Sequence, residues 1–175
     1  GTASGTFVIA KAAATVTLTN LSATYTAAPQ RPAAATGRAG RTLTLTGAAG
    51  AVVDGQGQGT VITVTADDVV VRGITVTGSG RLNADLDSGI KIVKGADRAL
   101  IDGNSIIGNL HGVDVHGGID SVVRGNTIVG LQLERMNDRG NGVYIWNAPG
   151  TVIDGNDIRY GRDGIFSNAS VPRLV

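Results

Sequence analysis

A short pattern centred on glycine recurs along this chain of 175 residues. Three copies are close to one another in sequence: ALIDGNSI at 99–106, SVVRGNTI at 121–128 and TVIDGNDI at 151–158. Two weaker copies, VVVRGITV and AVVDG, begin at Val69 and Ala51. The shared glycines are Gly55, Gly73, Gly103, Gly125 and Gly155. A chain that repeats one pattern in this way folds into stacked copies of one structural unit.

A second pattern led by glycine alternates with the first. It reads GIKIV, GVDVH, GVYIW and GIFSN, beginning at Gly89, Gly112, Gly142 and Gly164. These glycines are separated by 23, 30 and 22 residues. A basic period of about 22 residues therefore holds, and insertions near 81–88 and 132–140 account for the longer intervals. Both insertions are polar and carry charges of both signs, so we predict that they are loops leaving a regular coil.

Within each period, short runs of alternating apolar and polar residues are separated by Gly, Asn or Asp. Alternation with a period of two predicts β-strands, and helical periodicity is absent. Composition agrees, because 27 residues are Gly and the core must be aliphatic in a chain with only 3 Tyr, 2 Phe and 1 Trp. The sequence therefore predicts an all-β fold, a right-handed parallel β-helix of about five to six coils over residues 41–170.

The alternation also predicts which side chains point outward. In residues 112–116, Val113 and Val115 point to the core, whereas Asp114 and His116 point away from it. In-register stacking then forms two outer columns, Lys91, Asp114, Tyr144, Phe166 and Val93, His116, Trp146, Asn168. The repeat glycine is predicted to turn the chain with a positive φ. The residues after it predict a ladder of stacked amides, Asn104, Asn126 and Asn156.

The N-terminal segment, residues 1–36, differs from the rest. It contains no acidic residue and lacks the glycine repeat, and Val16 to Thr19 alternate as in a strand. This segment resembles part of an Ig-like repeat of bacterial surface adhesins. We expect it to be a β-strand cap or linker, because an open coil exposes strand edges. Residues 37–175 are then the β-helix domain, and a purely structural role in an adhesin is one open function.

Charge and cysteine content narrow the class of protein. The formal net charge of +1 gives no electrostatic case for binding nucleic acid or a membrane surface. No apolar run is long enough to span a membrane. The absence of cysteine excludes disulfides and thiolate metal sites. We expect an exported protein, periplasmic or extracellular.

Four stretches resemble the NosD family, the periplasmic accessory proteins of nitrous-oxide reductase. They are AVVDGQGQG at 51–59, GSGRLNADLDSGIKI at 78–92, DRGNGVYIWNAPG at 138–150 and YGRDGIFSNAS at 160–170. The resemblance implies a protein, part of a longer chain, that is not an enzyme. It also implies copper handling with a protein partner, either a membrane transporter or the copper enzyme being assembled.

Few side chains are suited to copper. His111, His116 and Met136 are the candidate ligands, with Asp114 as an oxygen donor, because imidazole and thioether groups bind copper. If His111 lies at the turn before its strand, its ring can approach His116. The alternatives are that both histidines are ordinary surface residues and that Met136 covers the coil.

A carbohydrate-related function is the alternative. HGVDVH at 111–116 resembles loosely the motif of mannuronan epimerases, with Asp114 and His116 and either Arg124 or Arg135 as catalytic residues. Asp114 and His116 also lie in the outer columns with three aromatic residues, so a binding surface is predicted that comprises Asp114, His116, Tyr144, Trp146 and Phe166. Such a face binds either polysaccharide or protein, unless the insertion 132–140 folds over it. Arg162-Asp163 and Asp67-Asp68 are interpreted as turn residues rather than a catalytic dyad or a calcium site.

Overall fold

The computed structural model describes residues 4–8, 15–19, 42–168 and 173–174 of the chain. Its strands form three sheets. Sheet A contains β1 (Ser4–Val8), β2 (Thr15–Thr19), β3 (Leu43–Gly47), β6 (Val69–Arg72), β9 (Leu100–Asp102), β12 (Val122–Arg124), β15 (Val152–Asp154) and β18 (Arg173–Leu174). Sheet B contains β4 (Val52–Asp54), β7 (Thr75–Thr77), β10 (Ser105–Asn109), β13 (Thr127–Gly130) and β16 (Asp157–Arg159). Sheet C contains β5 (Ile62–Val64), β8 (Ser88–Ile92), β11 (His111–His116), β14 (Val143–Trp146) and β17 (Ile165–Asn168).

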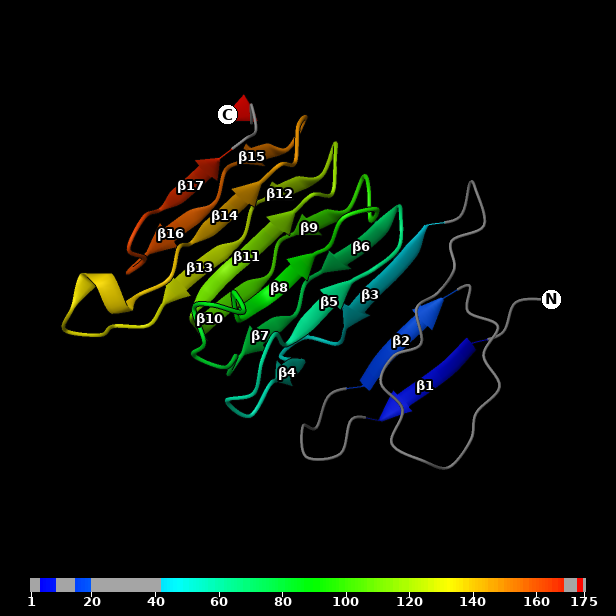
Figure 1. Cartoon of the computed structure of the whole chain (residues 1–175). Helices are drawn as coiled ribbons and strands as arrows, with labels where there is room; N and C mark the ends of the chain where they lie inside the picture. Colours follow the sequence, from blue (N-terminus) through cyan, green and yellow to red (C-terminus); the bar gives the residue numbers. More distant parts are fainter. Residues whose placement is uncertain (1–3, 9–14, 20–41, 169–172, 175) are drawn as a thin grey trace.

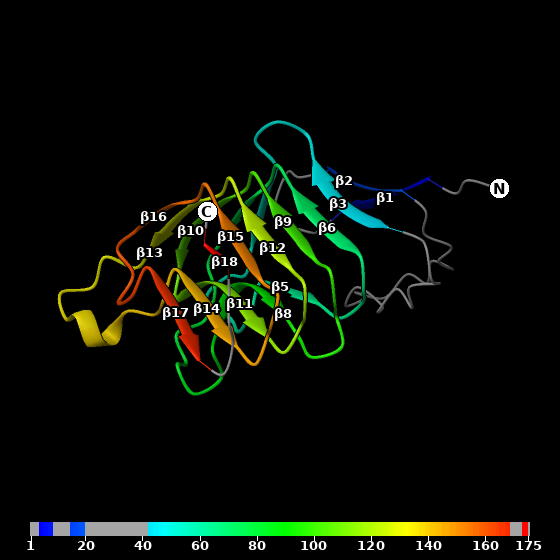
Figure 2. The ribbon, with the colours of Figure 1, turned by 90° about the horizontal axis from the view of Figure 1, so that it is seen from above.

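Each coil contributes one strand to each sheet, and strands of successive coils pair in parallel. For example, β3, β4 and β5 pair in parallel with β6, β7 and β8 of the next coil. Figures 1 and 2 show the coils stacked from β3 to β17. Five coils are complete in the described part of the chain, which confirms the predicted parallel β-solenoid. No helix of the described residues is long and apolar enough to cross a membrane.

The interior is aliphatic, as the scarcity of aromatic residues predicted. Inward-facing residues of the three sheets are almost fully buried, among them Val71, Val76, Ile101, Ile128 and Ile145. Val113 and Val115 of β11 have no exposed surface, as the alternation required. Because each coil repeats the same inward positions, Val and Ile side chains stack on one another along the solenoid and exclude water.

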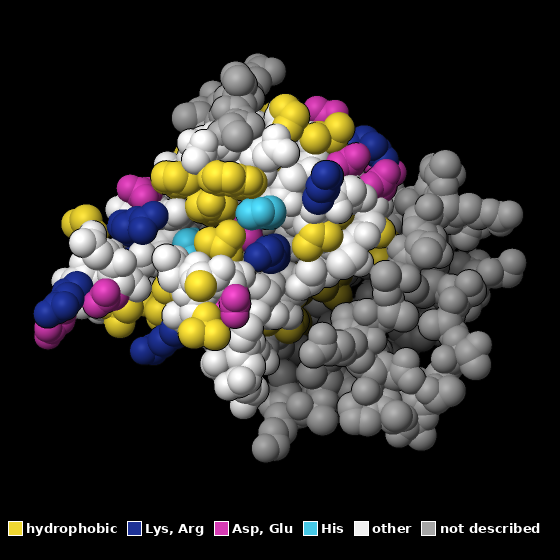
Figure 3. Space-filling model, viewed as in Figure 1, with side chains coloured by type: hydrophobic (Ala, Val, Ile, Leu, Met, Phe, Trp, Pro, Cys, Tyr) yellow, Lys and Arg dark blue, Asp and Glu magenta, His cyan; other side chains and the backbone are white. Residues whose placement is uncertain are grey.

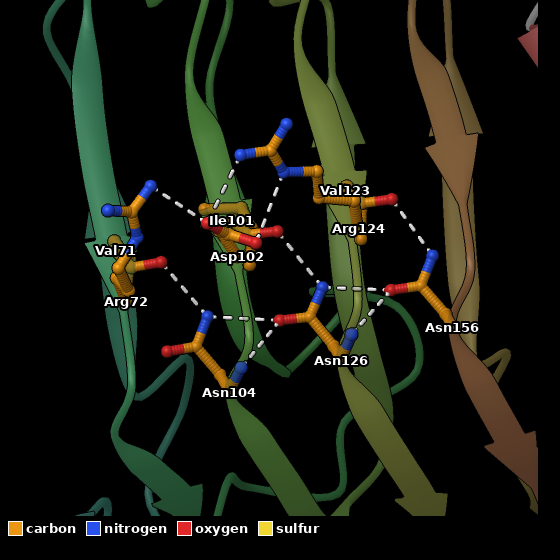
Figure 4. Close-up of polar contacts among 9 residues, drawn as sticks. All are labelled: Val71, Arg72, Ile101, Asp102, Asn104, Val123, Arg124, Asn126 and Asn156. Carbon is orange, nitrogen blue, oxygen red and sulfur yellow. Dashed lines mark hydrogen bonds and ion pairs between the residues drawn. The ribbon is translucent and has the colours of Figure 1, made fainter.

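The predicted asparagine ladder is confirmed at the corner between sheets A and B (Figure 4). Asn104 donates its side-chain amide to Oδ1 of Asn126 at 3.0 Å, and Asn126 donates to Oδ1 of Asn156 at 2.9 Å. The same amides donate to backbone carbonyls of the preceding coil, at 3.0 Å to Val71 and at 2.9 Å to Ile101. The ladder therefore satisfies buried polar groups that the turn would leave unpaired.

The glycine before this ladder has the predicted conformation in four of the five copies. The φ angles are +67° at Gly73, +62° at Gly103, +59° at Gly125 and +58° at Gly155. The prediction is wrong for Gly55, which does not have a positive φ. That coil instead turns at Gln56 and Gly57, with φ of 56° and 74°, and the Asp54 carboxylate accepts a hydrogen bond from the Gln56 amide at 2.8 Å.

The predicted N-terminal segment, residues 1–36, lies mostly outside the described residues. Its two described strands continue sheet A, since β1 pairs with β2 and β2 pairs with β3, both in antiparallel fashion. Figure 1 shows them beside the first coil. A strand at this edge covers the backbone groups that β3 would otherwise expose. The domain boundary and the choice between cap and linker stay predictions.

Candidate functional site

The outer face of sheet C carries the two predicted columns. Asp114 pairs across strands with Lys91 and Tyr144, and Tyr144 pairs with Phe166. In the second column, His116 pairs with Trp146, which pairs with Asn168. These pairs confirm the predicted register, whereas Val93, predicted beside His116, lies after the end of β8 at Ile92. Figure 3 shows hydrophobic side chains gathered beside a histidine on this face.

Four of these side chains form a ring cluster, which we define as His116, Tyr144, Trp146 and Phe166. Tyr144 and Phe166 are stacked, with centroids 5.2 Å apart and planes 8° apart. His116 lies 6.3 Å from Trp146 and 6.4 Å from Tyr144, with planes 14° and 11° apart. In-register parallel strands place equivalent residues about 4.8 Å apart, which suits parallel rings.

The ring cluster is accessible to solvent. Trp146 is 38% exposed, so the insertion 132–140 does not cover it. That insertion contains the 3₁₀ helix η1 (Met136–Asp138), which has no buried residue. Figure 1 shows η1 projecting from the connection between β13 and β14, beyond the end of sheet C. The face therefore has the exposed aromatic surface typical of a binding site.

Asp114 is the unusual member of this face. It lies in an outer column as predicted, but its side chain has no exposed surface. Lys91 Nζ lies 3.2 Å from Oδ2, and His116 Nδ1 lies 3.6 Å from Oδ1. Neither carboxylate oxygen has a hydrogen-bond partner in the described structure. Burial raises the pKa of Asp114, and the charges of Lys91 and His116 oppose that rise.

Lys91 connects this carboxylate to the first insertion. Its Nζ donates a hydrogen bond to the backbone carbonyl of Asp85 at 3.1 Å while it pairs with Asp114. The Lys91 side chain is 20% exposed. A long, partly exposed side chain thus lies at the boundary between Asp114 and solvent.

His111 is placed differently from the expectation. It is buried within β11, and its Nδ1 accepts a hydrogen bond from the backbone amide of Asn141 at 3.1 Å. Nε2 must then carry the proton, which it donates to Oδ1 of Asn83 at 3.0 Å. Both ring nitrogens are therefore occupied, and the ring does not turn toward His116. Burial, and next the charge of Arg162, lower the pKa of His111 to about 4.

The insertion 132–140 holds two further candidates, Met136 and Arg135. Met136 is 60% exposed, so it does not cover the coil. Arg135 immediately precedes η1 and is exposed. The arginine whose charge acts on Tyr144 and on His111 is instead Arg162, which sequence reasoning did not place at this site. The described residues contain no group of three or more His, Cys, Asp or Glu side chains able to hold a metal ion.

The remaining charged candidates form ion pairs. Arg162 Nε lies 3.2 Å from the Asp163 carboxylate. Arg98 bonds to Asp67 and Asp68, at 2.9 Å and 2.7 Å, so those acids are paired in a turn as interpreted. Arg124 bonds to Asp102 at 3.2 Å on sheet A (Figure 4), so the alternative role of Arg124 near Asp114 finds no support in its contacts.

Comparison with known proteins supplies the family. The model of the "right handed beta helix region" family matches residues 49–173. A "probable ABC transporter binding protein NosD" of Stutzerimonas stutzeri is 39% identical over 115 residues, which are 66% of this chain and 26% of that protein. The protein of the same name from Pseudomonas aeruginosa PAO1 is 35% identical over 124 residues, 71% of this chain and 29% of that protein. The chain thus spans little more than a quarter of these relatives, and it belongs to the right-handed β-helix family as a NosD-like member.

Proposed function

We propose that this chain is a binding segment of a NosD-like exported protein that is not an enzyme. It works with a membrane transporter and handles copper during maturation of a periplasmic copper enzyme. The observation that carries this proposal is the match of its coils to two relatives named probable ABC transporter binding protein. Residues 49–173, which match the family model, include the strands that bear the outer face of sheet C.

Copper is the cargo in this proposal, and His116 is its best-placed ligand. The His116 side chain is 39% exposed and lies beside a carboxylate, whereas both nitrogens of His111 are engaged in hydrogen bonds. Met136 offers an exposed thioether on the insertion 132–140. Imidazole and thioether groups both favour copper over hard cations.

Titration with Cu(I) and Cu(II) tests the copper part of the proposal. We expect micromolar or tighter binding that His116→Gln abolishes and Met136→Leu weakens. His111→Gln is expected to act on stability rather than on copper affinity, so each variant is checked for its unfolding midpoint. An unchanged titration in the His116→Gln/Met136→Leu double variant would show that copper is not bound through these residues.

A second candidate function is binding of a polysaccharide at the same face. The ring cluster favours it, because parallel aromatic rings next to charged side chains suit sugars. Trp146 fluorescence is the direct readout, since this residue is the chain's single tryptophan. A spectral change on adding uronate oligosaccharides supports this function, and silence across a panel of acidic and neutral oligosaccharides contradicts it.

A further inference from the structure

The carboxylate of Asp114 is buried on the outer face of sheet C. Neither of its oxygens has a hydrogen bond within the described part of the chain, although the side chain has no exposed surface. A buried polar group without hydrogen bonds destabilises a fold, and such groups concentrate at functional sites. Asp114 lies next to the ring cluster, since Tyr144 is its neighbour in the column and His116 approaches one of its oxygens.

The charges around Asp114 restrict what can satisfy it. Lys91 Nζ lies 3.2 Å from Oδ2, but neither oxygen has a hydrogen bond of good geometry within the described residues. Such a carboxylate suits a ligand with two adjacent donors, such as a guanidinium group or a pair of neighbouring hydroxyls. Lys91 lies 3.2 Å away, and the charge of Arg162 acts on the adjoining Tyr144 and His111. A cationic ligand would meet repulsion from both residues. Neutral hydroxyl donors would not.

We propose that this face binds a glycan through a vicinal diol that donates two hydrogen bonds to the Asp114 carboxylate. Lys91 donates a hydrogen bond to an oxygen of the same sugar, and the apolar face of the sugar ring, formed by its C–H groups, packs on the exposed part of Trp146. This inference rests on the second candidate function above and specifies the ligand chemistry. Arg135 does not take part in this binding, because it lies on the insertion directly before η1.

Lys91 controls access to the carboxylate. Its side chain is the partly exposed group that pairs with Asp114, and it is also bonded to the Asp85 carbonyl. Rotation of this flexible side chain uncovers Oδ2 without a change in the backbone. The sugar then replaces Lys91 at the carboxylate and remains within reach of its ammonium.

Two neutral oligosaccharides separate the diol from sugar binding in general. Glucose units linked 1,4 carry adjacent free hydroxyls at carbons 2 and 3, whereas internal units linked 1,3 carry no adjacent free pair. In calorimetric titrations of the wild-type chain we expect the 1,4-linked hexamer to bind at least about tenfold more tightly than the 1,3-linked hexamer. Equal affinities would overturn the role of the diol yet leave glycan binding standing. No binding of either, or of 1,4-linked mannuronate, would overturn both.

Variants then identify the carboxylate as the acceptor. Asp114→Asn keeps the shape of the side chain but replaces one acceptor oxygen by a donor, so the preference for the 1,4-linked hexamer should disappear. Lys91→Met should change affinity for that hexamer, whereas Lys94→Met, an exposed lysine just beyond β8, is the matched control and should not. Retention of the full 1,4-linked preference in a folded Asp114→Asn variant would overturn the inference.

Discussion

Nδ1 of His111 accepts a hydrogen bond from the backbone amide of Asn141, and its Nε2 lies 3.0 Å from the side chain of Asn83. Asn83 belongs to the first insertion and Asn141 follows the second, so one buried imidazole joins both insertions to β11. These two hydrogen bonds require a neutral ring, because a proton on Nδ1 would remove the acceptor that the Asn141 amide uses.

This geometry predicts that stability falls in mild acid. The pKa of His111 is lowered from 6.5 to about 4 in the fold. The unfolded chain therefore takes up a proton that the folded chain excludes, so the contribution is complete above the unfolded pKa and is lost as the pH falls toward the folded one. We expect a loss of about 3 kcal/mol over this window, measured as a change in the urea midpoint between neutral and acidic buffers.

The His111→Gln variant should show a flatter pH dependence than the wild type. His116→Gln is the matched control, because that histidine is partly exposed and makes neither of the hydrogen bonds that hold His111. NMR titration of the His111 ring offers a second check. A ring that titrates near 6.5 would contradict the neutral, bonded state described for it.

The asparagine ladder predicts that substitutions in its middle destabilise the fold more than substitutions at its end. Asn126 occupies its middle, where its Oδ1 accepts from the Asn104 amide and its own amide donates to Ile101 and Asn156. Asn126→Ala leaves buried groups of two coils unpaired and should destabilise the fold by about 2–4 kcal/mol. Chemical denaturation followed by circular dichroism measures this. Asn156→Ala, at the last described rung, should cost less, and equal costs would show that the ladder does not act as a connected network.

Two glycines at equivalent repeat positions predict opposite outcomes. A Cβ at Gly112 would lie 2.4 Å from the Gly142 carbonyl oxygen and 2.4 Å from Ile128, whereas a Cβ at Gly164 meets no atom of the described residues within 4 Å. Gly112→Ala should therefore destabilise the chain by about 1–3 kcal/mol through overpacking, and Gly164→Ala should be nearly neutral. Thermal unfolding of the two variants provides the comparison. Similar midpoints for the two variants would mean that β11 and β14 move apart at little cost to accept the added methyl group.

Repetition explains why the fold and the columns of sheet C could be predicted from the sequence. Each coil supplies an independent copy of the same pattern, so Val113, Asp114 and Tyr144 could be assigned to faces from spacing alone. The exceptions lie where one coil departs from the repeat. Gly55 does not have the predicted positive φ, because its coil turns one to two residues later, at Gln56 and Gly57.

The details of the site could not be predicted, because they depend on contacts between distant segments. The predicted column correctly placed Lys91 beside Asp114, yet alternation says nothing of the full burial of the Asp114 carboxylate. The hydrogen bond that His111 donates to Asn83 joins residues 28 positions apart, and Asn83 lies in an irregular loop. Arg162 could have been found, because it lies within two residues of Gly164, the glycine that leads the last copy of the second pattern.

The full burial of the Asp114 carboxylate predicts a stabilising substitution. Because burial raises the pKa of this carboxyl, the folded chain holds a proton more tightly than the unfolded chain does. The contribution of Asp114 to stability is therefore complete below the ordinary value of 3.8 and is lost as the pH rises through the folded pKa. Asp114→Asn removes this ionisation. Relative to the wild type, it should gain about 1–3 kcal/mol at neutral pH, as expected for relief of a buried unsatisfied group.

Urea denaturation of both proteins at about pH 3 and about pH 7 measures the effect. The difference in unfolding free energy between Asp114→Asn and the wild type should be small at the acidic pH and should favour the variant at the neutral pH. Asp85→Asn, a change in an exposed acid of the first insertion, is the matched control. A variant destabilised at the neutral pH but not at the acidic pH would mean that the ion pair with Lys91 outweighs the cost of burying the carboxylate.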